Sequence, residues 1–69
     1  MGRQGKSNKT ADVVRKLEAE GWFVARKGPG DHKQYKHPTK PGRVTIDYGA
    51  REIPTGTLRS IYRQAGWEW

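Results

Sequence analysis

The sequence contains no cysteine, which excludes a disulfide framework and a thiolate-rich zinc site. It also has no apolar run long enough to span a membrane and no visible signal peptide, so we expect a soluble cytoplasmic protein. Only 32% of the 69 residues are hydrophobic, which allows one thin core and therefore one domain. Stability must come from packing alone, with three tryptophans and three tyrosines as its largest contributors.

Acidic residues are also scarce. Seven Asp and Glu stand against 14 Lys and Arg, which gives a net charge of +7. A positive field of this size attracts nucleic acid or an acidic protein surface. The charge therefore indicates a class of partner, and it favours nucleic acid, without specifying a fold.

Residues 1–9 contain almost nothing to bury, and they predict a flexible basic lead-in to a single domain over residues 10–69. A first helix is predicted to begin with Thr10 as its N-cap and to end at Gly21 as its C′ residue. Between these two residues, apolar side chains recur at helical spacing. They are Val13, Val14 and Leu17.

A second helix is predicted between Pro54 and Gly66, with either Thr55 or Thr57 as its cap. Trp67 follows the glycine and is expected to fold back onto the helix, as apolar residues often do after a glycine cap. The apolar stripe of this helix consists of Leu58, Ile61, Tyr62 and Ala65.

Three strands are predicted between the helices, over residues 22–25, 33–37 and 44–48. In the third, Val44, Ile46 and Tyr48 alternate as inward residues. The order α-β-β-β-α predicts an α+β fold in which a three-stranded antiparallel sheet carries both helices on one face. The other sheet face would stay open to solvent.

The stretch from Gly28 to Pro38 organises the predicted open face. Its glycines permit a sharp turn that delivers His32 to the start of a strand. If Tyr35 points inward, strand alternation places His32 on the solvent side. The polar residues expected on that side are His32, Gln34, Lys36, Arg43 and Thr45.

Four stretches of the chain carry a resemblance to a known family. They are Gly30-Asp31-His32, the run at 35–38, the run at 42–45 and the block at 53–66. Over residues 10–67 the chain resembles the HicA toxins. The resemblance implies a fold like that of double-stranded-RNA-binding domains, and a ribonuclease that cleaves mRNA and is silenced by a HicB antitoxin. It matches Gly30 and His32 to the family's glycine and catalytic histidine, while Asp31 and Lys33 replace a serine and a second histidine.

RNA carries its own nucleophile, the 2′-hydroxyl, so cleavage requires proton transfer and charge stabilisation but no metal or other cofactor. An imidazole can take or give a proton at neutral pH. We therefore expect His32 to act as general acid or base, with general base favoured. Water, Lys33 and Tyr35 are all candidates for the second proton carrier. The residues expected to bind RNA are Gly30, Lys33, Gln34, Lys36 and Arg43.

Two neighbouring residues have simpler interpretations. Asp31 is a candidate for orienting His32, although adjacent residues in a strand point apart. His37 shares the inward parity of Tyr35, and we expect it to pack rather than to catalyse. The spacing of the two histidines gives no metal site.

Two non-catalytic functions compete with the ribonuclease. One is an RNA-binding module that uses the same basic sheet, since double-stranded RNA is recognised mostly by shape and backbone. The other is a protein-interaction domain whose positive surface serves an acidic partner. A HicB-like antitoxin is expected to cover the His32 face.

Overall fold

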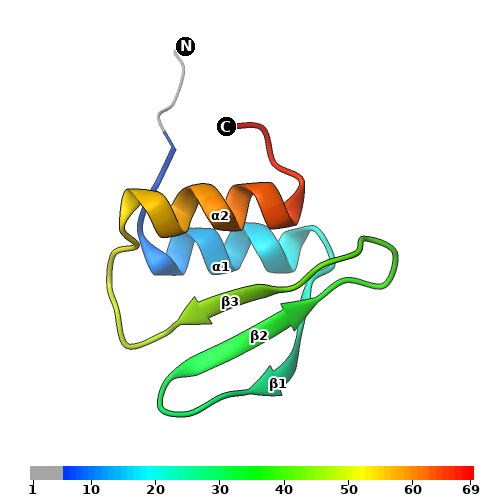
Figure 1. Cartoon of the computed structure of the whole chain (residues 1–69), viewed down its shortest axis with the longest axis horizontal. Coiled ribbons are helices and arrows are strands. Elements are labelled where there is room, and N and C mark those ends of the chain that lie inside the picture. Colours follow the sequence, from blue (N-terminus) through cyan, green and yellow to red (C-terminus); the bar gives the residue numbers. More distant parts are fainter. Residues whose placement is uncertain (1–5) are drawn as a thin grey trace.

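A computed structural model describes residues 6–69. The elements follow in the order α1 (Thr10–Ala19), β1 (Phe23–Lys27), β2 (His32–Lys36), β3 (Val44–Asp47) and α2 (Thr55–Ala65). Figure 1 shows both helices on one side of the sheet, which confirms the predicted α+β fold. Within residues 6–69, no helix has the length and apolar character needed to cross a membrane.

The predicted lead-in is described only from Lys6 onward, because residues 1–5 lie outside the described part of the chain. Its last residues are paired with the segment that precedes α2. The amide of Ile53 donates to the carbonyl of Asn8 at 2.8 Å, and Lys9 forms an isolated β-bridge with Glu52. This pairing holds the start of α1 beside the start of α2.

The sheet has the strand order β1-β2-β3, and both strand pairs are antiparallel. In the β2–β3 pair, Tyr35 stands opposite Val44 and His32 stands opposite Asp47. Paired residues share a face of the sheet, so Tyr35 and Val44 point toward the helices while His32 and Asp47 point away. The β1–β2 register shifts between Val24 and Arg26, which marks a bulge in β1.

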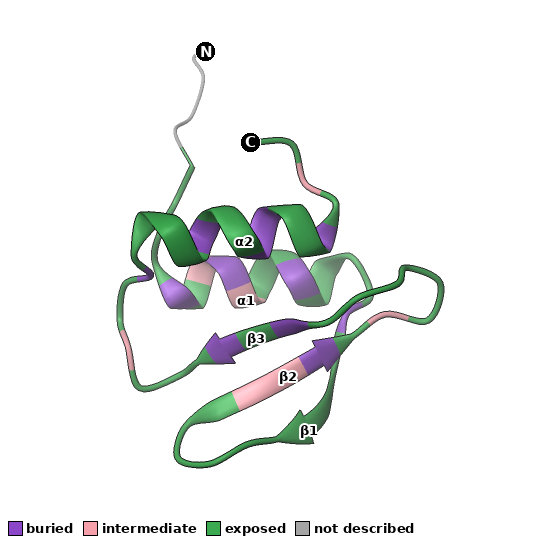
Figure 2. Cartoon of the chain, in the orientation of Figure 1, coloured by how far each residue is buried: buried purple, intermediate pink, exposed green. Residues whose placement is uncertain are grey.

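The core lies between the helix layer and the β2–β3 half of the sheet. Leu17 and Tyr35 are completely buried, and Trp22 is only 2% exposed. Figure 2 shows the buried positions on the facing sides of helices and sheet, whereas β1 is exposed along its whole length. The inward apolar residues predicted for α2 (Leu58, Ile61, Tyr62 and Ala65) are all buried.

The first helix ends in the Schellman arrangement that its glycine predicted. Gly21 has a φ of 96°, and its amide donates to Glu18 while the amide of Trp22 donates to Leu17. These two bonds satisfy carbonyls that the helix end would leave unpaired. They also turn the Trp22 side chain into the core.

The second helix repeats this ending. Gly66 has a φ of 79°, and the amide of Trp67 donates to the carbonyl of Tyr62 at 2.8 Å. The Trp67 ring packs edge-on against the Tyr62 ring, with centroids 5.0 Å apart. The predicted return of Trp67 onto the helix is therefore confirmed.

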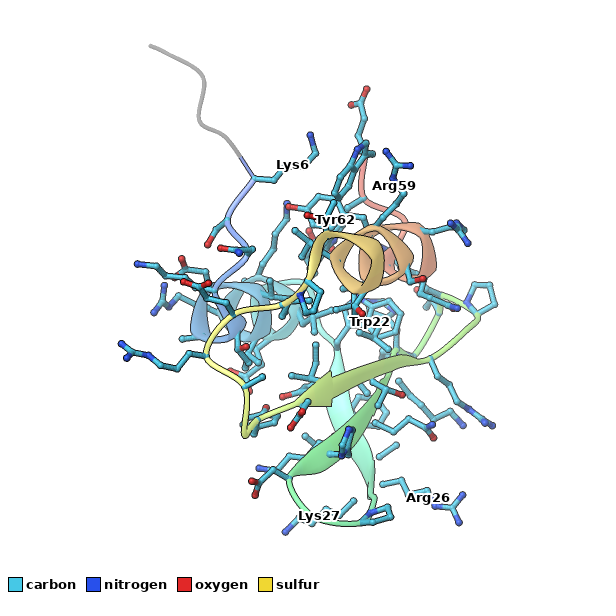
Figure 3. The ribbon with its side chains drawn as sticks, turned by 60° about the vertical axis from the view of Figure 1, so that its left-hand side comes forward. Lys6, Trp22, Arg26, Lys27, Arg59 and Tyr62 are labelled. Atoms are coloured by element: carbon cyan, nitrogen blue, oxygen red, sulfur yellow. The ribbon has the colours of Figure 1, made fainter. Side chains whose placement is uncertain are left out.

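The rest of the chain end stays on this helix surface. The Trp69 ring packs edge-on against Tyr62 at 5.3 Å, with the cationic groups of Lys6 and Arg59 each 5.0 Å from the Trp69 ring centroid. Figure 3 shows Lys6, Arg59 and Tyr62 together at one end of the molecule. Contacts of this kind contribute about 0.5–1 kcal/mol each at exposed sites.

The predicted helix caps were wrong. Thr10 is the first residue of α1 and not its cap, because its buried hydroxyl donates to the carbonyl of Ala50 at 2.6 Å. That bond fixes the helix to the loop after β3. At the start of α2, neither Thr55 nor Thr57 makes a capping bond, and the extended Pro54 precedes the helix.

The strand boundaries also differ from the predicted ones. β1 begins one residue later than expected, because Trp22 belongs to the helix ending. β2 runs from His32 to Lys36, so His37 lies beyond it. Tyr48, predicted to point inward, follows the end of β3 and is 37% exposed.

Gly56 in the first turn of α2 and Gly66 just after the helix provide a matched test of the helix ending. Gly66→Ala should destabilise the protein by about 1–2 kcal/mol, because an L-residue is strained at a positive φ. Gly56→Ala should stabilise it by about 0.5–1 kcal/mol, because a Cβ there meets no atom within 4 Å and alanine favours the helix. Urea denaturation measures both, and equal effects in the two variants would contradict the assignment.

Candidate active site

His32 is held at the first position of β2 by the turn that precedes it. The amide of Gly28 donates to the carbonyl of His32 at 2.8 Å, and the amide of His32 donates to the carbonyl of Pro29 at 3.3 Å. Gly30 supplies a φ of 63° between them, a conformation that glycine adopts without strain. The His32 side chain is 51% exposed on the open face, as predicted.

The contacts of the His32 ring distinguish its two nitrogens. Nδ1 lies 3.2 Å from the carbonyl oxygen of Pro29. A carbonyl can only accept, so Nδ1 carries the hydrogen in this contact. In the neutral ring, Nε2 then holds the lone pair, and it faces the carboxylate of Asp47 with a separation of 4.0 Å from Oδ2.

Asp47 is held in place by its own turn. Its Oδ1 accepts a hydrogen bond of 2.9 Å from the amide of Gly49, which leaves Oδ2 toward His32. The sequence analysis gave Asp47 no role, although strand alternation puts it on the face opposite to Val44 and Ile46. The role of Asp47 follows from the antiparallel register of β2 and β3, which brings the end of β3 opposite the start of β2.

Asp31 does not take the orienting role considered for it. Its carboxylate lies beside Gly49, where a Cβ would meet Asp31 Oδ2 at 2.9 Å. Among residues 6–69, no hydrogen bond or ion pair joins Asp31 to the ring of His32. The aspartate that faces the His32 ring is therefore Asp47, whereas the carboxylate of Asp31 lies beside Gly49.

A hollow of about 480 Å³ opens beside His32 and is called the basic hollow here. Figure 3 shows two of its cations, Arg26 and Lys27, near the β1–β2 hairpin, far from Lys6 and Arg59. The polar side chains that line it are Arg26, Lys27, His32, Lys33, Gln34 and Thr45. These basic residues beside an imidazole make this surface suited to a phosphate group.

The structure separates the residues predicted to bind RNA into two groups. His32, Lys33 and Gln34 line the basic hollow, although Lys33 has the inward parity and its Nζ lies 4.1 Å from the Tyr48 ring centroid. Lys36 and Arg43 instead line another hollow, of about 550 Å³.

Gly30 shapes the turn but lines neither hollow. Sequence reasoning also missed Arg26 and Lys27 as partners of His32. Their role follows from the pairing of β1 with β2, in which Arg26 stands opposite Gln34 and Lys27 stands opposite Lys33.

The second histidine is structural, as expected. His37 Nδ1 accepts from the backbone amides of Thr39 and Lys40, at 3.1 and 3.2 Å, so Nε2 carries the hydrogen and donates to the carbonyl of Glu20 at 2.8 Å. Its ring also meets the edge of Trp22 at 5.2 Å. His37 therefore ties the turn after β2 to the end of α1.

The structure removes Tyr35 from the candidate proton carriers. Its side chain is completely buried, and its hydroxyl pairs with that of Tyr48. Burial, with a smaller contribution from the charge of Glu18, raises the pKa of Tyr48, so the Tyr48 hydroxyl stays protonated at neutral pH.

Within the described part of the chain, no three His, Asp or Glu side chains gather in a way that could hold a metal ion.

The comparison with family models gives a match to the HicA toxins of bacterial toxin–antitoxin systems over residues 10–67. The chain belongs to the HicA toxin family. A toxin–antitoxin complex from Streptococcus pneumoniae contains a similar chain, with 30% sequence identity and a TM-score of 0.67. The similarity covers 86% of this chain and 97% of that one. No curated protein matches the sequence.

The HicA match includes every helix and strand of the structure. It begins at the first residue of α1 and ends at Trp67, just after the glycine that closes α2. His32 and Asp47 both lie inside the matched range, so the pair belongs to the HicA domain itself.

The two histidines should respond differently to substitution. His37→Ala should lower the free energy of unfolding by about 1–3 kcal/mol, because it leaves a turn and a helix end without their hydrogen bonds. His32→Ala should change it by less than about 0.5 kcal/mol, because the ring is half exposed and makes one weak bond. Thermal denaturation measures both, and the reverse order would contradict these roles.

Proposed function

We propose that this toxin is an endoribonuclease that cleaves mRNA with His32 as its general acid/base. The observation that carries the proposal is the orientation of the His32 ring. Its Nδ1 donates to a backbone carbonyl, while Nε2 faces a carboxylate at the edge of the basic hollow. No metal is needed to supply the nucleophile, because the 2′-hydroxyl of RNA attacks its own phosphodiester.

In the first half of the reaction, Nε2 of His32 takes the proton of the 2′-hydroxyl. The resulting imidazolium keeps its Nδ1–H bond to Pro29 and gains an opposite charge in Asp47, 4.0 Å away. The oxygen of the 2′-hydroxyl then attacks phosphorus. In this proposal, Arg26 and Lys27 of the basic hollow stabilise the negative charge that develops on the phosphorane, whereas the ammonium group of Lys33 lies over the Tyr48 ring.

The second half of the reaction requires a proton for the departing 5′-oxygen. Lys33 and water are the remaining carriers, since Tyr35 is sealed in the core. Lys33 lines the basic hollow with its Nζ 4.1 Å from the Tyr48 ring centroid, so its side chain must leave that ring in order to donate the proton.

The proposed protein partner is a HicB-like antitoxin that covers the His32 face. The similar chain from Streptococcus pneumoniae was solved in a toxin–antitoxin complex, and the face around His32 presents exposed cations on an open sheet. An acidic partner seated there would exclude RNA from the basic hollow by occupying the same charges.

His32→Ala should reduce RNA cleavage at least about 100-fold, which is the usual contribution of a positioned acid or base. RNA binding should change by less than about twofold, because the three cations of the basic hollow remain. Cleavage of a labelled transcript and fluorescence anisotropy measure the two quantities. His37→Gln serves as the control that changes an imidazole away from the site, at a temperature at which thermal denaturation shows this variant to be folded.

A wild-type protein that binds RNA with a steep salt dependence and does not cut it would be the RNA-binding module instead. A protein with no affinity for RNA at low salt would be the protein-interaction domain. Induction of wild-type and His32→Ala proteins in cells, with growth and mRNA integrity followed, tests the same distinction in vivo.

Asp47→Asn should lower kcat by up to about fivefold, because a half-exposed ion pair is worth up to about 1 kcal/mol. The asparagine can still accept the Gly49 hydrogen bond through its side-chain oxygen, so the turn keeps its shape. Single-turnover cleavage measures the rate. Asp31→Asn, which removes the neighbouring charge, should have the smaller effect if Asp47 is the residue that assists His32.

A further inference from the structure

A second hollow, of about 390 Å³, adjoins His32 on the side of β3. It lies between β3 and the segment that leads into α2, and is called the acidic hollow here. His32 and Thr45 line both hollows. A ligand group in the basic hollow at His32 therefore has a second binding space immediately beside it.

The two hollows differ in charge. The basic hollow is lined by Arg26, Lys27 and Lys33. The acidic hollow has no lysine or arginine among its lining residues, and instead has the carboxylates of Asp47 and Glu52. A phosphate is favoured in the first hollow and disfavoured in the second, so the acidic hollow suits an uncharged part of an RNA strand better than its backbone.

The walls of the acidic hollow suit a flat, uncharged group. Its apolar lining includes the exposed Pro54 and three isoleucines that are largely buried in the core, Ile46, Ile53 and Ile61. Hydroxyl and carboxylate groups stand along the same space, with Thr57 at the start of α2. A few polar groups on an apolar wall are typical of pockets that orient a planar ligand.

We propose that the acidic hollow binds the nucleobase adjacent to the scissile phosphate, and that it favours bases with an exocyclic amino group over uracil. This inference rests on the proposed ribonuclease function, and it assigns to the acidic hollow the selection of the RNA base at the cleavage site. Ionised carboxylates only accept hydrogen bonds. Adenine, cytosine and guanine offer an amino group to them, whereas uracil offers mainly carbonyl oxygens along its edge.

The preference is measured with DNA oligonucleotides that contain one ribonucleotide, so that each has a single cleavable bond. The base on either side of that bond is varied through all four types. We expect kcat/KM for the three amino-bearing bases to exceed that for uracil by about tenfold at one of the two positions. Equal cleavage of all substrates at both positions would overturn the proposal.

Two threonines in the first turn of α2 provide a matched pair of variants. Both are exposed, but only Thr57 lines the acidic hollow. Thr57→Leu fills the hollow and removes a hydroxyl, and it should reduce the tenfold preference to less than about threefold. Thr55→Leu adds the same apolar group outside the hollow and should keep the preference. If both variants keep it, the hollow is not the base site.

A binding measurement separates this inference from the proposed function. Oligonucleotides with a 2′-O-methyl group at the variable site cannot be cleaved, and their affinity for the wild-type protein is measured by anisotropy. Base discrimination without cleavage of any RNA substrate would support the acidic hollow and overturn the ribonuclease. Cleavage without discrimination would support the ribonuclease and overturn the hollow.

Discussion

The burial of Tyr35 is the constraint on which the rest of the site depends. This side chain is completely enclosed near the end of β2, and its hydroxyl finds a partner in Tyr48. A strand that slipped by one residue would bring Tyr35 to solvent and a charged neighbour into the core, at a cost that the thin core could not offset. The parity of β2 is thereby fixed. With it, His32 is directed to the open face at the point where β2 leaves its turn.

Fixed parity and antiparallel pairing together assemble the site from distant parts of the chain. Once Tyr35 pairs with Val44, the pairing of His32 with Asp47 follows three residues further along the same ladder. The hairpin with β1 brings Arg26 opposite Gln34 in the same way. One histidine thus acquires a carboxylate from β3 and cations from β1, although none of these residues is its neighbour in sequence.

The sequence predicted the element order, the inward residues of α2 and the glycine ends of both helices, because each depends on local periodicity or on one residue's backbone preference. It predicted the exposure of His32 for the same reason. The predicted N-cap of α1 was wrong because the hydroxyl of Thr10 bonds to Ala50, 40 residues away. No local sequence pattern reveals such a partner. Arg26, Lys27 and Asp47 were missed because their roles arise only from the pairing of strands.

The full exposure of β1 has a consequence for the proposed binding of RNA. This edge strand is bulged and buries none of its own residues, whereas β2 lies between two strands and is anchored by Tyr35. Segments with few buried contacts open at the lowest free-energy cost. In the proposed ribonuclease, the wall that carries Arg26 and Lys27 would therefore adjust to phosphates more easily than the β2 backbone that carries His32. The adjustable cations and the proposed catalytic histidine would then reside on separate strands.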